Sequence, residues 1–331
     1  FLPGTSIAKD QFVSILIYHK FNNPDSPSTS IDTETFEAQL KFLKENNYHV
    51  LSMPEFIDCL EKGSFPPRSV LITIDDGYKS VYEYAYPLLK KYGFPFTVFL
   101  YMEGIGRYPD YMSISQVKEL LSSGVTMGNH SYSHKRMARS FLWKSPEDYK
   151  RFILQDLEKS TSRFKKLFGF TPKIYAYPYG EYNPELRELL VKEGYKVAFT
   201  QDPGNVSPAT DPYLIPRNAI VGSWAALKHF KKTLKEPPLT VFKYFPDYGV
   251  LKENPPREIA FFVPDINKYK NYWIYVSEIG WLKPEIDTRE KRVFVRKLPV
   301  LERTINRIGI KAIERDTGRL ARFFYMVINP F

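Results

Sequence analysis

The chain has 331 residues, 43% of them hydrophobic, so it can bury a sizeable core and has the length at which one core usually gives way to two domains. Lys and Arg outnumber Asp and Glu by 47 to 37, and the formal charge of +10 favours an anionic surface or polymer only weakly. The basic residues are spread along the chain without a nucleic-acid-binding motif, which argues against a nucleic-acid partner.

The pattern from residue 14 to about residue 235 predicts repeated β-α units around a parallel sheet, because short apolar runs alternate with helix-period stretches. Six or more such units favour a closed or nearly closed barrel over a small open sheet. The first expected helix has Thr33 as its N-cap. The expected strands are Ser14 to Tyr18, Val70 to Ile74, Thr97 to Tyr101, Val125 to Met127, Ile174 to Tyr177 and Val197 to Thr200. The expected helices cover residues 34 to 46, 80 to 92, 114 to 122, 147 to 168, 184 to 193 and 223 to 235.

A second, all-β domain is expected after Pro237-Pro238, which ends the helical pattern. We therefore predict a barrel over residues 1–237 and an accessory domain over residues 238–331, most like a small immunoglobulin-like sandwich. Asp316-Thr317-Gly318 lies between the last two apolar runs and predicts a terminal hairpin. The expected strands of this domain are Glu258 to Val263, Tyr272 to Val276, Arg292 to Leu298, Ile308 to Glu314 and Leu320 to Ile328.

Two of the five histidines, His130 and His134, lie four residues apart, directly after an expected strand. On a helical turn this spacing places both imidazoles on one face, as a shared metal ion requires. Two unrelated surface histidines are the alternative, because such pairs occur by chance in polar loops. Ser131 stands where one class of metallopeptidase has a glutamate, and this excludes that class.

Two adjacent carboxylates, Asp75 and Asp76, end the expected strand that begins at Val70, and Gly77 lets the chain turn. Like charges this close repel each other, so the pair predicts a cation or a hydrogen-bond network nearby. Neighbouring side chains in extended backbone point apart, so the two aspartates should differ in role. In the alternative interpretation, one of them merely caps the helix that begins near Ser80.

The two motifs Thr73-Ile-Asp-Asp-Gly77 and His130-Ser-Tyr-Ser-His134 resemble the first two motifs of the polysaccharide deacetylase family (carbohydrate esterase family 4), in the same order and at similar separation. Three further segments resemble the biofilm poly-N-acetylglucosamine deacetylases within that family: Ile15-Leu-Ile-Tyr-His19, Phe36-x3-Leu40-x-Phe42-Leu43 and Ala176-Tyr-Pro-Tyr-Gly-Glu-Tyr-Asn183. The resemblance implies a distorted, NodB-like β/α barrel. It also implies metal-dependent N-deacetylation of a polysaccharide that contains N-acetylglucosamine, with release of acetate.

Carried over by position, the resemblance implies that Asp76, His130 and His134 hold a divalent metal, zinc first, with cobalt or nickel as alternatives. Three protein ligands leave one position open for water and substrate, which distinguishes a catalytic from a structural zinc site. Asp75 is then the general base. The loop that contains Tyr179 resembles the family motif whose backbone N–H helps to stabilise the oxyanion.

Two further site residues are implied by the biofilm branch of the family. In that branch the histidine that protonates the leaving amine comes at the first strand, which here is His19; a histidine hydrogen-bonded at a strand end is the alternative. The usual third motif begins with an arginine that orients the catalytic aspartate, but this chain has Ala176 there. Arg217 could supply the same charge from another loop, unless it is a simple surface arginine. The family's fourth motif is not recognisable in Gln201 to Pro212.

Other functions remain open from the sequence alone. A catalytically inactive barrel could bind an envelope polysaccharide, and the same three ligands could serve another metal-dependent hydrolase. A phosphoesterase is disfavoured, because no glycine-rich phosphate loop or arginine cluster lies near the motifs. Among deacetylases, enzymes acting on peptidoglycan or chitin oligomers are the next alternative.

The expected partner is an N-acetylated polysaccharide, and an envelope polymer could also contact the basic C-terminal domain. That domain carries 17 basic and 11 acidic residues from Leu239 onward. No apolar run of the given chain is long enough to cross a bilayer. Phe1 to Asp10 have neither a charged leader nor a long apolar stretch. The resemblance and the missing initiator Met lead us to expect a secreted, cell-surface or periplasmic location.

The remaining histidines and the single cysteine are expected to have no catalytic role. His49 is expected to be structural, and His229 to lie on a solvated helix face within a basic stretch. Cys59 has no histidine near it in sequence, so we expect a buried structural thiol.

Overall fold

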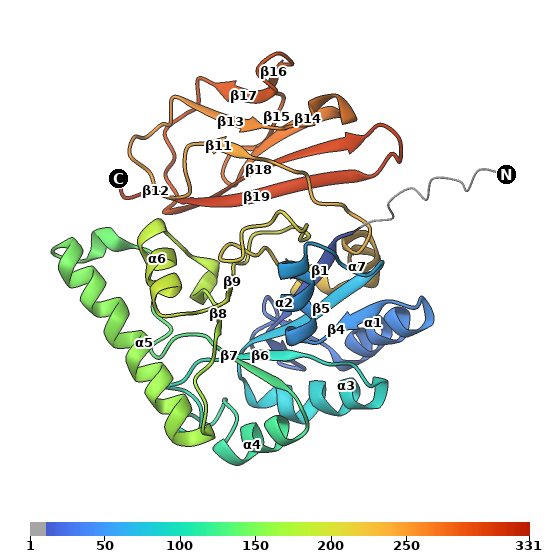
Figure 1. The fold of residues 1–331 in the computed structure, drawn as a ribbon, viewed down its shortest axis with the longest axis vertical. Helices are drawn as coiled ribbons and strands as arrows, with labels where there is room; N and C mark the ends of the chain where they lie inside the picture. Colours follow the sequence, from blue (N-terminus) through green and yellow to red (C-terminus); the bar gives the residue numbers. More distant parts are fainter. Residues whose placement is uncertain (1–10) are drawn as a thin grey trace.

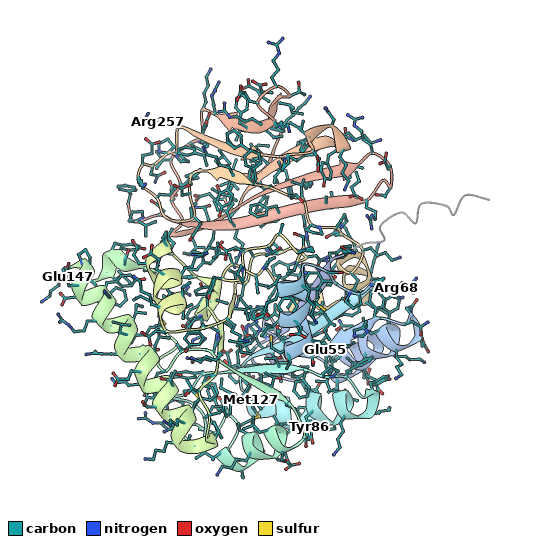
Figure 2. The ribbon with its side chains drawn as sticks, in the orientation of Figure 1. Glu55, Arg68, Tyr86, Met127, Glu147 and Arg257 are labelled. Carbon is teal, nitrogen blue, oxygen red and sulfur yellow. The ribbon has the colours of Figure 1, made fainter. Side chains whose placement is uncertain are left out.

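The computed structural model describes residues 11–331, so the expectation for Phe1 to Asp10 lies outside the described residues. The chain folds into a β/α barrel with a β-sandwich stacked on one side of it (Figure 1). Side chains fill the space between strands and helices, while the charged side chains of Arg68, Glu147 and Arg257 are exposed (Figure 2). None of the described helices is both long and apolar enough to span a membrane.

The barrel is built on one parallel sheet of eight strands, as the alternating pattern predicts. Ile215 forms a bridge with Phe199 at one end of the sheet, and the chain then continues into the strand at the other end, so a single segment joins both ends. The strands in spatial order are β10 (Asn218–Ala219), β1 (Val13–Tyr18), β5 (Ser69–Asp76), β6 (Thr97–Leu100), β7 (Thr126–Asn129), β8 (Ile174–Ala176) and β9 (Val197–Phe199), and β4 (His49–Leu51) also pairs with β5.

Strands β1 and β5 are buried on both faces and are therefore mostly apolar, apart from a few hydroxyl residues and the two aspartates that end β5. Leu16 and Ile72 belong to the apolar cluster that also holds residues of α1 and α3, whereas Ile15 and Leu71 belong to a second cluster with Phe56 of α2. Successive side chains thus alternate between two cores.

Helices surround the sheet (Figure 1). The N-cap of α1 is Asp32, whose side chain accepts a hydrogen bond from the N–H of Thr35, so the prediction of Thr33 is wrong by one residue. The helix predicted over residues 80 to 92 begins with a π-helical turn at Val81–Ala85, and the one predicted over 223 to 235 is interrupted at Ala226. The helices are α1 (Thr33–Glu45), α2 (Met53–Lys62), α3 (Tyr86–Tyr92), α4 (Ile114–Ser122), α5 (Pro146–Phe168), α6 (Pro184–Lys192) and α7 (Leu227–Thr233).

Two mainly antiparallel sheets form the C-terminal sandwich, as expected. The predicted terminal hairpin is confirmed, with Ile313 opposite Leu320 across its turn. Helix α7 ends at Thr233, and we propose the domain boundary at residues 237/238. The four-stranded sheet contains β11 (Lys243–Phe245), β13 (Glu258–Phe262), β17 (Arg292–Arg296) and β16 (Glu285–Asp287). The five-stranded sheet contains β12 (Gly249–Val250), β19 (Leu320–Ile328), β18 (Ile305–Glu314), β14 (Tyr269–Val276) and β15 (Gly280–Leu282).

The five-stranded sheet connects the sandwich to the barrel. Met326 and Ile328 of β19 are buried in one apolar cluster with residues of α6. Arg307 lies 3.4 Å from the buried carboxylate of Asp202, and Arg322 lies 3.0 Å from Glu236. Apolar burial and ion pairing therefore hold the two parts together.

Candidate metal centre

The predicted site residues come from the ends of different barrel strands. Asp75 and Asp76 are the last two residues of β5, His130 directly follows β7, and His19 directly follows β1. Tyr179 comes three residues after β8. The carboxyl ends of parallel strands meet at one face of a barrel, where enzymes with this fold place their sites.

Three of these residues converge on one point. Asp76 Oδ1 lies 3.0 Å from His134 Nε2 and 3.3 Å from His130 Nε2. A cation with bonds of about 2.0–2.1 Å in tetrahedral geometry separates its ligands by roughly 3.4 Å, so both distances from Asp76 are close to what such an ion needs. Within residues 11–331, these three side chains form a cluster of potential metal ligands whose ligand atoms all lie within 4.8 Å of one another.

The hydrogen bonding of His130 supports the same interpretation. Its Nδ1 lies 2.8 Å from the carbonyl oxygen of Ala176, which can only accept, so Nδ1 carries the proton. In the neutral ring Nε2 then presents a lone pair toward a carboxylate oxygen of Asp76. No described N–H or O–H group donates to that buried oxygen, Oδ1. Two facing lone pairs repel each other, so either a proton on Nε2 or a metal ion must lie between them, and a backbone carbonyl behind the distal nitrogen is the usual support of a metal-binding histidine.

The loop that carries the two histidines is not a helical turn, so the geometric premise of that prediction is wrong. Ser131 and His134 adopt positive φ angles of 68° and 51°. The buried carboxylate of Asp156 in α5 accepts hydrogen bonds from the backbone N–H groups of Tyr132 and Ser133, at 2.8 and 3.0 Å. Asp156 therefore braces the loop that aims both imidazoles at Asp76, a role that sequence reasoning missed.

Two further residues of this site have strained backbone angles. Asp76 and Tyr179 adopt φ angles of 73° and 60°, a region that non-glycine residues rarely occupy. Such strain persists only where the surrounding structure enforces it, and it tends to accumulate at functional sites. Neither Asp75 nor Asp76 caps the helical segment that begins near Ser80, so the capping alternative is wrong.

Asp75 has a different partner from Asp76, as the alternation along a strand predicts. Arg217 donates two hydrogen bonds to its carboxylate, at 2.7 and 2.8 Å, and a third to the carbonyl oxygen of Thr200. Arg217 is 0% exposed, so the surface alternative is wrong. Asp75 Oδ2 also lies 3.9 Å from His130 Nε2, beside the three potential ligands.

The electrostatics keep both carboxylates ionised. Burial by itself would raise the pKa of Asp75, but the charges of Arg217 and His130 outweigh burial and hold the pKa below its usual value. Burial has the same effect on Asp76, whose pKa the neighbouring imidazoles of His130 and His134 hold well below the usual value. An ionised Asp75 beside the three potential metal ligands is able to accept a proton.

His19 lies at the edge of the same group. Its ring is half-buried, and burial lowers its pKa, although the charges of Asp76 and Asp75 act in the opposite direction. Its Nδ1 has no hydrogen-bond partner among the described residues. The alternative interpretation requires a hydrogen bond that holds His19 at the strand end. The structure shows no such bond at Nδ1.

Aromatic and basic side chains form the rim of the site. The ring of Tyr179, a residue that is 40% exposed, lies 4.7 Å from the ring of His134, and the guanidinium of Arg136 lies over the Tyr179 ring, 3.9 Å from its centroid. Glu181, which is buried, forms ion pairs with both Arg136 and Arg139. These two arginines and Glu181 were not found from the sequence, because nothing in the spacing of these residues marks a buried ion pair.

The other histidines and the cysteine lie away from the three potential ligands. His49 is exposed on β4, and His229 is half-buried on α7, next to Thr233. Cys59 is half-buried on α2, so the expectation of a buried thiol is wrong.

Comparison with known proteins gives consistent matches. A family model described as polysaccharide deacetylase matches residues 62–198. A curated poly-β-1,6-N-acetyl-D-glucosamine N-deacetylase of Staphylococcus aureus is 32% identical over 231 residues, which cover 68% of this chain and 79% of the relative.

Solved structures match a similar share of the chain. The IcaB protein of Ammonifex degensii is 27% identical, with a TM-score of 0.57, over 65% of this chain and 94% of that one. The deacetylase PplD of Streptococcus pyogenes, solved with acetate, is 22% identical, with a TM-score of 0.61, over 68% and 99%. These likenesses confirm the predicted barrel fold.

Proposed function

This chain belongs to the polysaccharide deacetylase family, and from that premise we propose that it hydrolyses N-acetyl groups of a polysaccharide, with a divalent metal held by Asp76, His130 and His134. The observation that carries the proposal is the convergence of these three side chains beside an ionised Asp75. Hydrolysis breaks the amide C–N bond of an N-acetylglucosamine unit and yields acetate and a free amine.

The donor set of one carboxylate and two imidazoles suits zinc, and cobalt or nickel would also fit. A bound divalent cation would polarise the acetamide carbonyl and acidify the attacking water. Asp75 accepts the proton of that water, and Arg217 holds the carboxylate in place from behind. The backbone N–H of Tyr179 is proposed to stabilise the negative charge that develops on the carbonyl oxygen.

Replacing Arg217 by Lys is expected to lower kcat by about 10- to 100-fold, because lysine keeps the charge but cannot make the bidentate contact that orients Asp75. KM and metal content should change little. Steady-state kinetics of acetate release and metal analysis of the same sample would test this. An unchanged kcat would show that Asp75 needs no orientation by Arg217.

Replacing His19 by Gln is expected to lower the rate of amide hydrolysis by about 10²- to 10⁴-fold if His19 protonates the leaving amine. An activated acetyl ester needs no such proton, so its hydrolysis by the same variant should be affected far less. Comparing both substrates at one pH separates general-acid catalysis from a structural role. Equal losses on amide and ester would contradict the assignment.

The proposed substrate is poly-β-1,6-N-acetylglucosamine or a related aminoglycan, because the curated relative carries that substrate in its name. We also propose an extracytoplasmic location, where the enzyme would encounter such a polymer, and contact of the basic C-terminal domain with an envelope polymer.

The substrate proposal is tested by acetate release from poly-β-1,6-N-acetylglucosamine, chitin oligomers and peptidoglycan glycan strands, with and without a chelator. Chelator-sensitive release that is fastest on the first polymer supports the proposal; polymer binding without acetate release, even with added zinc, would favour an inactive binding protein.

A further inference from the structure

One face of the five-stranded sheet is only partly covered by the barrel. Met326 and Ile328 of β19 are buried against the barrel, but Trp273 of β14 and Trp281 of β15 are 38% and 39% exposed. The sandwich core lies on the opposite face of this sheet, where Ile274 is fully buried. The part of the sheet formed by β14 and β15 therefore presents large apolar rings to solvent beside the barrel.

The rings on this part of the sheet are in register across four strands. Trp281 of β15 pairs with Tyr275 of β14, Tyr275 pairs with Gly309 of β18, and Gly309 pairs with Phe324 of β19. The ring centroids of Tyr275 and Trp281 lie 5.0 Å apart, those of Tyr275 and Phe324 5.8 Å, and those of Trp281 and Phe324 6.1 Å. Three rings thus form one continuous apolar surface.

Gly309 is required for this surface. A Cβ at position 309 would lie 2.4 Å from ring atoms of Phe324, closer than carbon atoms approach in proteins. The ring of Phe324 therefore lies over the glycine, and any other residue at this position would push it away from Tyr275. We call this surface the aromatic face, and its members are Trp273, Tyr275, Trp281, Gly309, Lys311 and Phe324.

The aromatic face has a positive charge and no acidic member. Lys311 places its ammonium group 3.6 Å from the ring centroid of Trp281. Burial lowers the pKa of Lys311, and the charge of Lys232 on α7 lowers it further. Arg322, which is opposite Lys311 in the neighbouring strand, is paired with Glu236. A cationic ligand would meet like charge here, whereas a neutral ligand rich in hydrogen-bond acceptors would not.

We propose that the aromatic face binds the N-acetylated polysaccharide and prefers it to the deacetylated product, an inference that rests on the proposed function for the identity of the polymer. A pyranose ring has an apolar C–H face that can stack on an aromatic ring, and its polar edge remains in solvent. An acetamido group adds a methyl group and a carbonyl acceptor for Lys311. A deacetylated unit instead carries an ammonium group, which the ammonium group of Lys311, 3.6 Å from the ring centroid of Trp281, would repel.

The test measures binding of the full chain to soluble poly-β-1,6-N-acetylglucosamine, in an Asp75→Asn background so that the ligand is not consumed. The double variant Trp273→Ala/Trp281→Ala is expected to weaken binding at least tenfold. The control Phe242→Ala removes an aromatic residue that is 63% exposed beside the other sheet and should leave binding unchanged. Trp281→Phe keeps a ring and should retain most of the affinity, and the thermal midpoint of each variant establishes that it is folded.

Further outcomes separate the proposed preference, the binding face and the proposed function from one another. Fully deacetylated polymer that binds as tightly as the acetylated form would overturn the proposed preference. Full polymer affinity in the double variant, or binding of this face to anionic phospholipid vesicles but not to the polymer, would overturn the aromatic face as a polysaccharide site. In the otherwise wild-type chain, the double variant should keep its kcat on short oligomers. Polymer binding through this face without acetate release by the wild-type chain would contradict the proposed function and leave the aromatic face supported.

Discussion

Replacing Asp75 by Asn is expected to lower kcat for acetate release by about 10²- to 10⁴-fold while the bound metal stays at the wild-type level. Asparagine is nearly isosteric and can still accept a hydrogen bond from Arg217, but it cannot take a proton from water. The three potential metal ligands are untouched by the substitution. Acetate release per metal-loaded molecule and metal content by mass spectrometry would be measured on one preparation.

The substitution also leaves the fully buried Arg217 without a counter-charge, and losing one partner of a buried ion pair costs about 3–5 kcal/mol. The kinetics must therefore be measured well below the thermal midpoint of the variant. A suitable control is Asp202→Asn, which neutralises another buried aspartate, one that pairs with Arg307, and should keep wild-type kcat. Loss of metal from Asp75→Asn as severe as from a ligand variant would overturn the assignment of Asp75 as the base.

Replacing His130 by Ala is expected to abolish both metal binding and acetate release. The substitution removes one of three potential ligands and leaves the carbonyl oxygen of Ala176 without its partner. Loss of a residue behind a metal ligand already weakens metal binding by about 10- to 100-fold, so loss of a ligand should have a larger effect. Zinc titration with a competing chelator would measure the affinity.

His49→Ala is the matched control for this variant, because His49 is exposed on β4 and does not belong to the cluster of potential metal ligands. It should bind zinc and release acetate like the wild-type chain. Wild-type zinc affinity in His130→Ala would show that the metal, if there is one, is held elsewhere.

The sequence predicts most of the barrel because its strands are buried on both faces and stand out as apolar runs. It does not reveal β4, which is short and only partly buried, or β10, which has two residues. Helix α2 could have been found, since Ser52 and Glu55 form a reciprocal capping box at its start. The N-cap of α1 was misplaced because Asp32 and Thr33 are adjacent and both residue types are good caps.

The candidate site is partly predictable for a related reason. Asp75 and Asp76 end an apolar strand, and the topology of a parallel barrel brings strand ends together whatever the loops do. The loop that orients His134 depends on Asp156, whose position in the middle of a helix gives no local signal. Likewise, Arg217 is 142 residues away from Asp75 in the sequence, and only the fold shows that Arg217 is buried and contacts Asp75.

Anomalous diffraction at the zinc edge, from crystals of the zinc-loaded chain, would show whether Asp76, His130 and His134 share one divalent cation. One strong peak is expected about 2.0–2.2 Å from a carboxylate oxygen of Asp76 and from the Nε2 atoms of both histidines. A peak bound by other residues, or none between these three side chains at saturating zinc, would contradict such a shared site.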